Sequence, residues 1–177
     1  MQVSTTVGAA PVSRECAPQR QNRLVPLIDA VKATLVQLRE VIAALDAAQY
    51  TARPVGNIDA SVGGHVRHCL DHVGSIIALG ASRKLDYDVR ERGTAVETDP
   101  RAAAAEIDRL NAALDQCARC DPIAPIELAV TLTGDGVRSL VTTTLARELA
   151  FVHSHTIHHS ATIATMAAVL GAPIPDR

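Results

Sequence analysis

Aromatic side chains are almost absent from this chain of 177 residues, which contains no Trp. Its Phe and Tyr residues are Tyr50, Tyr87 and Phe151. Hydrophobic residues still make up 47% of the sequence, so the core must be built mainly from Ala, Val, Leu and Ile. Because β-sandwiches depend on aromatic and β-branched side chains, this composition disfavours them. The length fits one compact domain with a full core. We therefore expect an all-α domain.

Apolar residues recur at spacings of three and four in the first half of the chain, a pattern typical of amphipathic helices. They predict one helix over about 22–48 and a second helix that ends at about 82. Asp59 or Ser61 can cap the start of the second helix, because both side chains accept hydrogen bonds from free helical N–H groups. The charged segment 83–100 that follows is a long surface connection, a kind of loop that is often functional.

Two further helices are predicted in the second half of the chain. Asp99, with a proline directly after it, has the sequence of a helix start and predicts a third helix through about Cys117. The last helix is predicted to begin near 142–144 and to end at Leu170, where a glycine follows. Four long helices in one small domain indicate a four-helix bundle.

Two segments outside the helices have distinct compositions. Val and Thr in 127–133, followed by Gly-Asp-Gly at 134–136, predict a short β-hairpin before the last helix. Residues 1–20 are polar and rich in Ala and Pro, which indicates a disordered or loosely packed N-terminal arm. The expected organisation is therefore this arm and a single helical domain over 21–177.

Charge and targeting signals narrow the classes of partner. Basic and acidic residues nearly balance, 17 against 19, and base-stacking rings are scarce, so nucleic acid is not an expected partner. The first twenty residues have no basic start and no apolar run, so they do not form a signal peptide. The uncharged stretch 149–175 contains four histidines, which a lipid-facing helix would bury at considerable cost. We expect a cytoplasmic protein without a membrane span.

The four cysteines are then expected to be mostly reduced. Cys117 and Cys120 form a CxxC motif, but the redox version of this motif belongs to a strand-to-helix junction, which the sequence does not predict here. No second CxxC completes a zinc site. The motif alone therefore assigns no function.

The seven histidines fall in two short windows, 65–72 and 153–159. His155 and His159 are four residues apart and lie within roughly 40° of each other on one helix face, so they can share an ion. In the second predicted helix, three histidines occupy neighbouring positions: His65, His68 and His72. At least one of them can point across the bundle core. The pattern predicts a site of three imidazoles from two facing helices.

Three neutral imidazoles suit Zn, Ni or Fe(II) and leave coordination positions open for water or substrate. Such a site is a strong Lewis acid that lowers the pKa of a bound water or thiol. Glu148, seven residues before His155, and Asp71, three residues after His68, can each accept a proton from a ligating imidazole and fix its tautomer.

Two segments resemble the DinB-like superfamily of metal-binding four-helix bundles, which is related to bacterial thiol S-transferases. In this family one histidine follows the serine that opens the second helix, and an HxxxH pair lies on the last helix. The resemblance implies Zn or Ni bound by His68, His155 and His159, a homodimer, and a low-molecular-weight thiol such as glutathione as co-substrate. The segments are Ser61-Val-Gly-Gly-His-Val-Arg-His68-Cys-Leu-Asp-His72 and Arg147-Glu-Leu-Ala-Phe-Val-His-Ser-His155-Thr-Ile-His-His159.

The sequence thus leaves three hypotheses. The first is a metal-dependent enzyme, a thiol S-transferase or hydrolase that acts on a small molecule, with carboxylates held by Arg90 and Arg92. The second is a non-catalytic metal-binding bundle or stress-linked interaction protein, in which a fourth histidine, His65 or His72, fills the site. The third is a metal-free bundle that dimerises through Ala-rich faces. In the first hypothesis the other histidines line the pocket: His65, His72 and His158.

Overall fold

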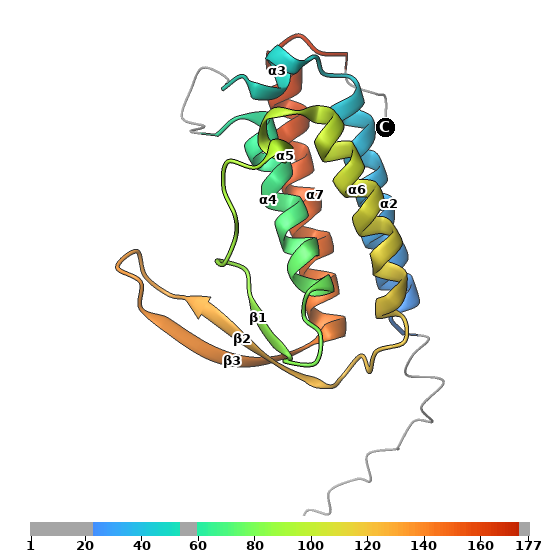
Figure 1. Ribbon diagram of the computed structural model, residues 1–177, viewed down its shortest axis with the longest axis vertical. Coiled ribbons are helices and arrows are strands. Elements are labelled where there is room, and N and C mark those ends of the chain that lie inside the picture. Colours follow the sequence, from blue (N-terminus) through green and yellow to red (C-terminus); the bar gives the residue numbers. More distant parts are fainter. Residues whose placement is uncertain (1–22, 54–59, 174–177) are drawn as a thin grey trace, which may run out of the picture.

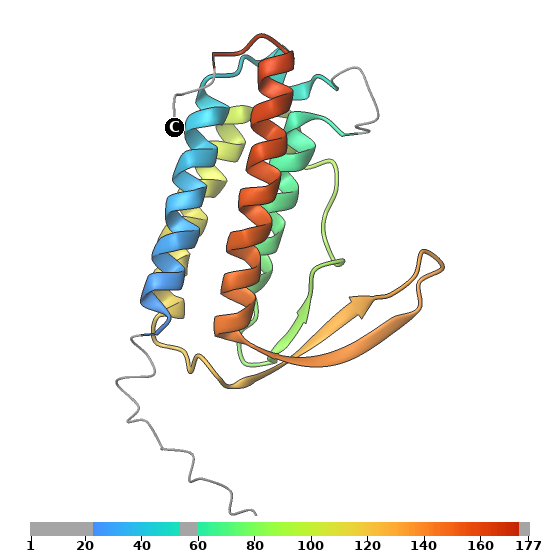
Figure 2. The same ribbon diagram turned by 180° about the vertical axis from the view of Figure 1, so that it is seen from behind.

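The computed structural model describes residues 23–53 and 60–173, which are mostly helical and include a small three-stranded sheet. The four longest helices lie side by side (Figures 1 and 2). Helix α7 packs against α2 and α4, and α6 packs against the same two helices from the other side. The bounds of these four helices are α2 Val25–Ala43, α4 Val62–Ile77, α6 Pro100–Cys117 and α7 Leu145–Val169.

The core between these helices is almost entirely aliphatic, as the composition predicts. Tyr50 is the only aromatic residue of the described part that is fully buried. Its hydroxyl donates a hydrogen bond to the carbonyl of Val96 at 2.7 Å. This bond joins two short helices that the sequence analysis did not predict, α3 (Ala47–Thr51) and α5 (Ala95–Thr98). The largest aliphatic side chains of the core are Leu24, Leu35, Leu38, Ile42, Ile107, Leu110, Leu114, Ile126, Leu149 and Ile163.

The single helix predicted over 22–48 is wrong at its C-terminal end. Helix α2 stops at Ala43, and α3 begins after Asp46. The Asp46 carboxylate accepts from the Gln49 backbone N–H at 2.7 Å, while the Gln49 side chain accepts from the Asp46 N–H at 3.0 Å. This reciprocal pair is a capping box, a start signal that ends one helix and begins another.

The second predicted helix begins as expected but is shorter. Ser61 caps α4 by accepting from the Gly64 N–H at 3.0 Å, whereas the alternative cap, Asp59, lies outside the described residues. The helix ends at Ile77 rather than near 82, because a turn with Gly80 at φ +50° follows. The helix beginning at Pro100 and the last helix match their predictions within about one residue.

The all-α expectation is incomplete, because three strands form one sheet in the order β1-β2-β3. Strands β2 (Pro125–Thr131) and β3 (Arg138–Thr144) form the predicted hairpin, which is longer than expected and projects beyond the helices (Figure 1). Strand β1 (Lys84–Asp86) pairs in parallel with β2, with Leu85 opposite Leu128. The segment predicted as a plain connection is therefore anchored to the sheet.

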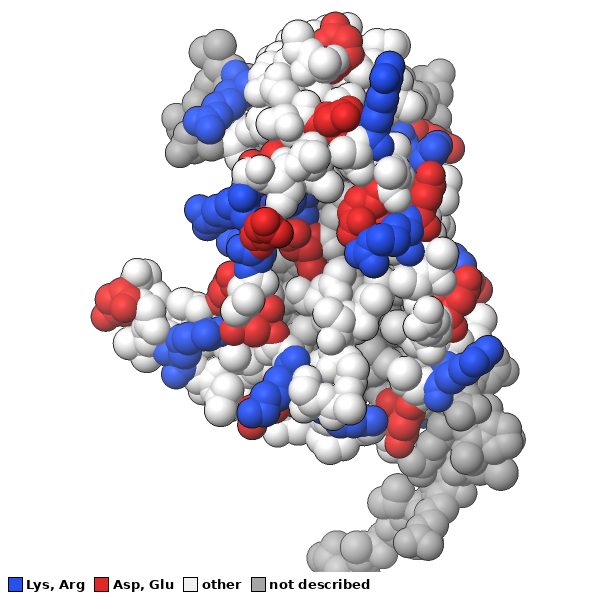
Figure 3. Space-filling view, in the orientation of Figure 1, with Lys and Arg blue, Asp and Glu red and all other residues white. Residues whose placement is uncertain are grey.

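The predicted arm at 1–20 lies outside the described residues. Among the residues that are described, no helix is long and apolar enough to cross a membrane. Basic and acidic side chains are interspersed on the face shown in Figure 3. That face therefore has no large region of one charge.

Gly63 lies where α4 crosses α5 most closely. A Cβ atom at Gly63 would lie 2.1 Å from the backbone oxygen of Glu97 and 2.7 Å from a ring carbon of Tyr50. The next residue, Gly64, has room, since its Cβ would meet the Ser61 hydroxyl at 3.4 Å. Only Gly63 is therefore needed for the close approach of these two helices.

We expect Gly63→Ala to lower the free energy of unfolding by about 2 kcal/mol or more, because backbone atoms must move to admit the methyl group. Gly64→Ala is the matched control and should be neutral or stabilising by up to about 1 kcal/mol, since alanine favours a helix over glycine. Urea denaturation followed by circular dichroism measures both. Equal stabilities of the two variants would contradict the packing described here.

Candidate metal centre

Four imidazoles meet where α4 packs against α7. His68 and His72 lie one turn apart on α4, and His155 and His159 lie one turn apart on α7. The Nε2 atoms of His68 and His155 are 2.9 Å apart. The ring of His159 has its centroid 4.7 Å from that of His68 and 4.5 Å from that of His155. The two rows of histidines that the sequence predicted on facing helices thus form one cluster.

One ring nitrogen from each of His68, His72 and His155 lies within 4.8 Å of the others, close enough for all three to hold one ion. This set shares two members with the predicted trio and has His72 in place of His159. The Nδ1 atom of His159 lies 3.3 Å from Nδ1 of His65 instead. Ligation by His159 therefore stays a prediction, and His72 is a further candidate.

The orientation of His72 suits a metal ligand. Its Nδ1 lies 2.8 Å from the backbone oxygen of His68, which can only accept, so Nδ1 carries the proton and Nε2 has a free lone pair. The Tyr87 ring stacks on the imidazole at 4.7 Å and 13°. The spacing of His68 and His72, the same i, i+4 as the pair on α7, was the sequence signal for this ligand.

Arg90, a predicted pocket residue, contacts the cluster, whereas Arg92, the other predicted arginine, is exposed. Nη1 of Arg90 lies 3.0 Å from Nδ1 of His68. Because a guanidinium only donates, Nδ1 of His68 accepts, and the imidazole proton is on Nε2. His68 therefore donates from Nε2 to His155 when no ion is bound.

The imidazoles of the cluster are held in the neutral form that binds metals. Burial, reinforced by the neighbouring histidines and Arg90, lowers the pKa of His68 to about 3. Burial and adjacent imidazoles lower the pKa values of His155 and His159 to about 4. Burial also lowers the pKa values of His65 and His72.

Glu148 is fully buried, but its carboxylate binds groups other than an imidazole. It accepts from the Tyr87 hydroxyl at 2.8 Å, the Thr143 hydroxyl at 2.6 Å and Nη1 of Arg147 at 2.8 Å. Its connection to the cluster runs through Tyr87, which stacks on His72. Sequence reasoning missed Tyr87 because the aromatic residue stands alone in an aperiodic segment.

Asp71 likewise binds a side chain other than an imidazole. Its carboxylate pairs with Nη1 of Arg67, whose Nε lies 2.6 Å from Glu97. Desolvation raises the pKa of Asp71, and the Arg67 charge opposes this shift. Asp71 therefore belongs to a network that ties α4 to α5.

The remaining histidines lie at the edges of the cluster. His65 contacts His159, and its buried Nε2 has no hydrogen-bond partner among the described residues. His158 is exposed, with its ring centroid 5.4 Å from that of His159. His153 points elsewhere, since its Nδ1 lies 3.0 Å from the Thr34 hydroxyl of α2.

A cavity of about 330 Å³ opens beside the cluster, between β2 and the N-terminal half of α7. Its walls include His72, Tyr87 and Phe151, and residues 128–131 of β2 also line it. Arg147 also lines it, with its guanidinium carbon 5.1 Å from the Phe151 ring centre. A small molecule in this cavity would lie directly against His72.

Comparison with known proteins agrees with this geometry. The family model described as DinB superfamily matches residues 30–163, which is well over half of the chain. No curated protein and no solved structure matches. The matched range contains both histidine rows.

We expect the metal-free protein to lose stability as the pH falls from about 7 to 4. An unfolded imidazole takes up its proton near pH 6.5, whereas His68, His155 and His159 titrate only near 3 to 4 when folded. The unfolded state therefore binds more protons in this window, which favours unfolding. Urea denaturation at a series of pH values measures the slope of the free energy of unfolding against pH.

His155→Gln should reduce this slope, because the variant removes one of the histidines whose pKa is lowered in the folded protein. His158→Gln is the control, since His158 is exposed and contributes only through its charge to the lowered pKa values of His155 and His159, and it should reduce the slope less than His155→Gln does. Identical slopes for both variants and the parent would contradict burial of these imidazoles as the cause of the pH dependence of stability.

Proposed function

Because the chain belongs to the DinB superfamily, we propose that it is an enzyme whose three-imidazole site holds a divalent metal that activates a thiol or a water. The observation that carries this proposal is the cluster itself. Ring nitrogens of His68, His72 and His155 come together from two helices, and burial keeps the imidazoles neutral. A thiol S-transferase or hydrolase uses such a site.

The donor set fits a borderline-soft ion, and Zn or Ni is the proposed metal. His68 and His155 belong to both candidate ligand sets, and the third ligand is His159 by the family pattern or His72 by its fixed tautomer. When bound, the ion supplies a Lewis acid that lowers the pKa of a thiol or water.

The protein's own residues position the substrate. Tyr87 and Phe151 form the walls of the cavity beside His72. Arg147 and Asp88 bring opposite charges to the same cavity. The Tyr87 hydroxyl is held by Glu148, so the ring keeps its place against His72. Arg90, next to His68, is placed to hold a carboxylate of a thiol such as glutathione. The proposed substrate is therefore a small molecule.

A non-catalytic metal-binding bundle is the second candidate. It is favoured by the number of imidazoles. If both His72 and His159 joined His68 and His155, four nitrogens would fill a tetrahedral site. A homodimer and a cytoplasmic location are proposed with either candidate, the homodimer on the family resemblance.

We expect a near-stoichiometric divalent metal in the protein after incubation with Zn or Ni and removal of the excess. His155→Gln should lose it, because His155 belongs to both ligand sets, whereas the exposed His158→Gln should retain it. Elemental analysis of His72→Gln and His159→Gln then identifies the third ligand. A parent protein that retains no ion under these conditions would refute the metal site.

Glutathione should change the absorption spectrum of the cobalt-substituted protein if a coordination position is open. Arg90→Gln should weaken this response about tenfold in apparent affinity, a loss of about 1.4 kcal/mol, while the exposed Arg92→Gln serves as control. Conjugation assays on a panel of electrophiles then test turnover. A spectrum that no thiol alters, together with four imidazole ligands, would favour the non-catalytic bundle.

A further inference from the structure

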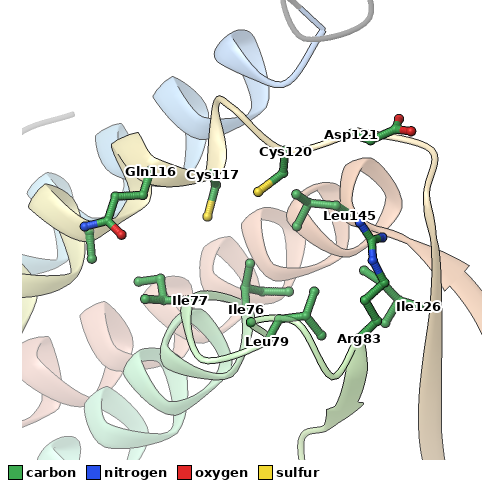
Figure 4. Close-up of a pocket in the computed structure, with 12 residues that line it drawn as sticks. Ile76, Ile77, Leu79, Arg83, Gln116, Cys117, Cys120, Asp121, Ile126 and Leu145 are labelled. Carbon is green, nitrogen blue, oxygen red and sulfur yellow. The ribbon is translucent and has the colours of Figure 1, made fainter.

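A second cavity, of about 280 Å³, lies at the end of the bundle where α6 stops and α7 begins (Figure 4). Its walls are apolar side chains of α4, β2 and α7, among them Ile76, Ile126 and Leu145. None of its lining residues lines the cavity beside the histidines. The two cavities are therefore separate sites.

Both cysteines of the CxxC motif line this second cavity. Cys117 is the last residue of α6, and the Cys120 N–H donates to its carbonyl at 3.0 Å, which closes a tight turn. Such a turn holds the two Cα atoms within about 7 Å, and disulfides need about 4.4–6.8 Å. Figure 4 shows the two sulfur atoms directed into the same space.

The two thiols differ in accessibility. Cys117 is only 8% exposed, whereas Cys120 is exposed to solvent. Burial, together with the neighbouring Cys120, raises the pKa of Cys117 to about 11. Cys117 is also the last residue of α6, where the negative end of the helix dipole disfavours a thiolate. Because the Cys117 thiolate is not stabilised, it gives the reduced form no advantage over a disulfide.

Two charged side chains line this cavity, Arg83 and Asp121. The Asp121 carboxylate accepts from the backbone N–H of Ile123 at 3.1 Å. Arg83 lines the cavity from the turn before β1, and its backbone is in the left-handed region, with φ +51°. The side chain has no hydrogen bond or ion pair with any residue that the structure describes. An unpaired guanidinium near an accessible thiol attracts a reagent that carries a carboxylate.

We propose that this cavity is a site of thiol–disulfide exchange with low-molecular-weight disulfides that carry carboxylates. The Cys120 thiolate attacks one sulfur of the disulfide, which forms a mixed disulfide and releases one thiol. Cys117 then gives up its proton and attacks the Cys120 sulfur, which forms the Cys117–Cys120 bond and releases the second thiol. The disulfide gains two electrons and two protons, and the protein dithiol loses them.

The test uses oxidised glutathione and peptide mass spectrometry of the full chain, with Cys16→Ser in every sample. The parent should form the Cys117–Cys120 disulfide and keep no glutathione. Cys117→Ser and Cys117→Ala should each retain one glutathione on Cys120, because the second step is blocked. Cys120→Ser should react at least tenfold more slowly, since the remaining thiol is buried. Cys69→Ser is the control and should behave like the parent.

The charge at Arg83 has its own test. Arg83→Gln should slow the reaction with oxidised glutathione severalfold and leave the reaction with neutral hydroxyethyl disulfide unchanged, whereas Arg101→Gln, outside the cavity, should alter neither rate. A parent that keeps glutathione on Cys120, without a Cys117–Cys120 bond, would overturn the exchange site. Equal effects of Arg83→Gln on both disulfides would overturn the proposed preference for carboxylates. Metal content is measured on the same samples, so this result is independent of the proposed function.

Discussion

The packing of α4 against α7 is the interaction on which the histidine cluster depends. Each helix carries two imidazoles one turn apart, and the helices approach closely enough to bring Nε2 of His68 within 2.9 Å of Nε2 of His155. The surrounding core is mainly aliphatic, and its few buried polar side chains include Glu148, Thr156 and Ser160. Burial in this setting penalises imidazolium and keeps the rings neutral. The same packing therefore builds the site and sets its protonation state.

Sequence reasoning predicted the features that local patterns determine. Apolar spacing located the long helices, and Asp99 and Ser61 marked helix starts. The histidine spacing predicted that an imidazole of the second helix would meet the pair on the last helix, and the family resemblance selected His68, whose ring meets that of His155. Sequence reasoning failed where long-range contacts decide the structure. Strand β1 has only three residues and exists because β2 pairs with it. The capping box at Asp46 was a local signal that was overlooked within an otherwise helical apolar pattern.

The same distinction between local patterns and long-range contacts applies to the residues of the site. The ring positions follow from helical periodicity, but the groups that fix tautomers come from backbone and from distant segments. His72 is oriented by the backbone carbonyl of His68, which no spacing argument displays. Glu148 and Asp71 were expected to bind imidazoles, yet hydroxyl groups and arginines closer to them satisfy their carboxylates. A buried carboxylate binds whichever strong donors the fold brings closest.

The small sheet has its main effect on the site rather than on the core. Parallel pairing of β1 with β2 fixes Leu85 opposite Leu128, and Tyr87 follows two residues later, where it stacks on His72 and donates to Glu148. Three residues further, Arg90 reaches His68. Without the strand pairing, this segment would have no register relative to α4 and α7. The sheet therefore positions an aromatic wall and a cation beside these imidazoles, in addition to the groups that the helices supply.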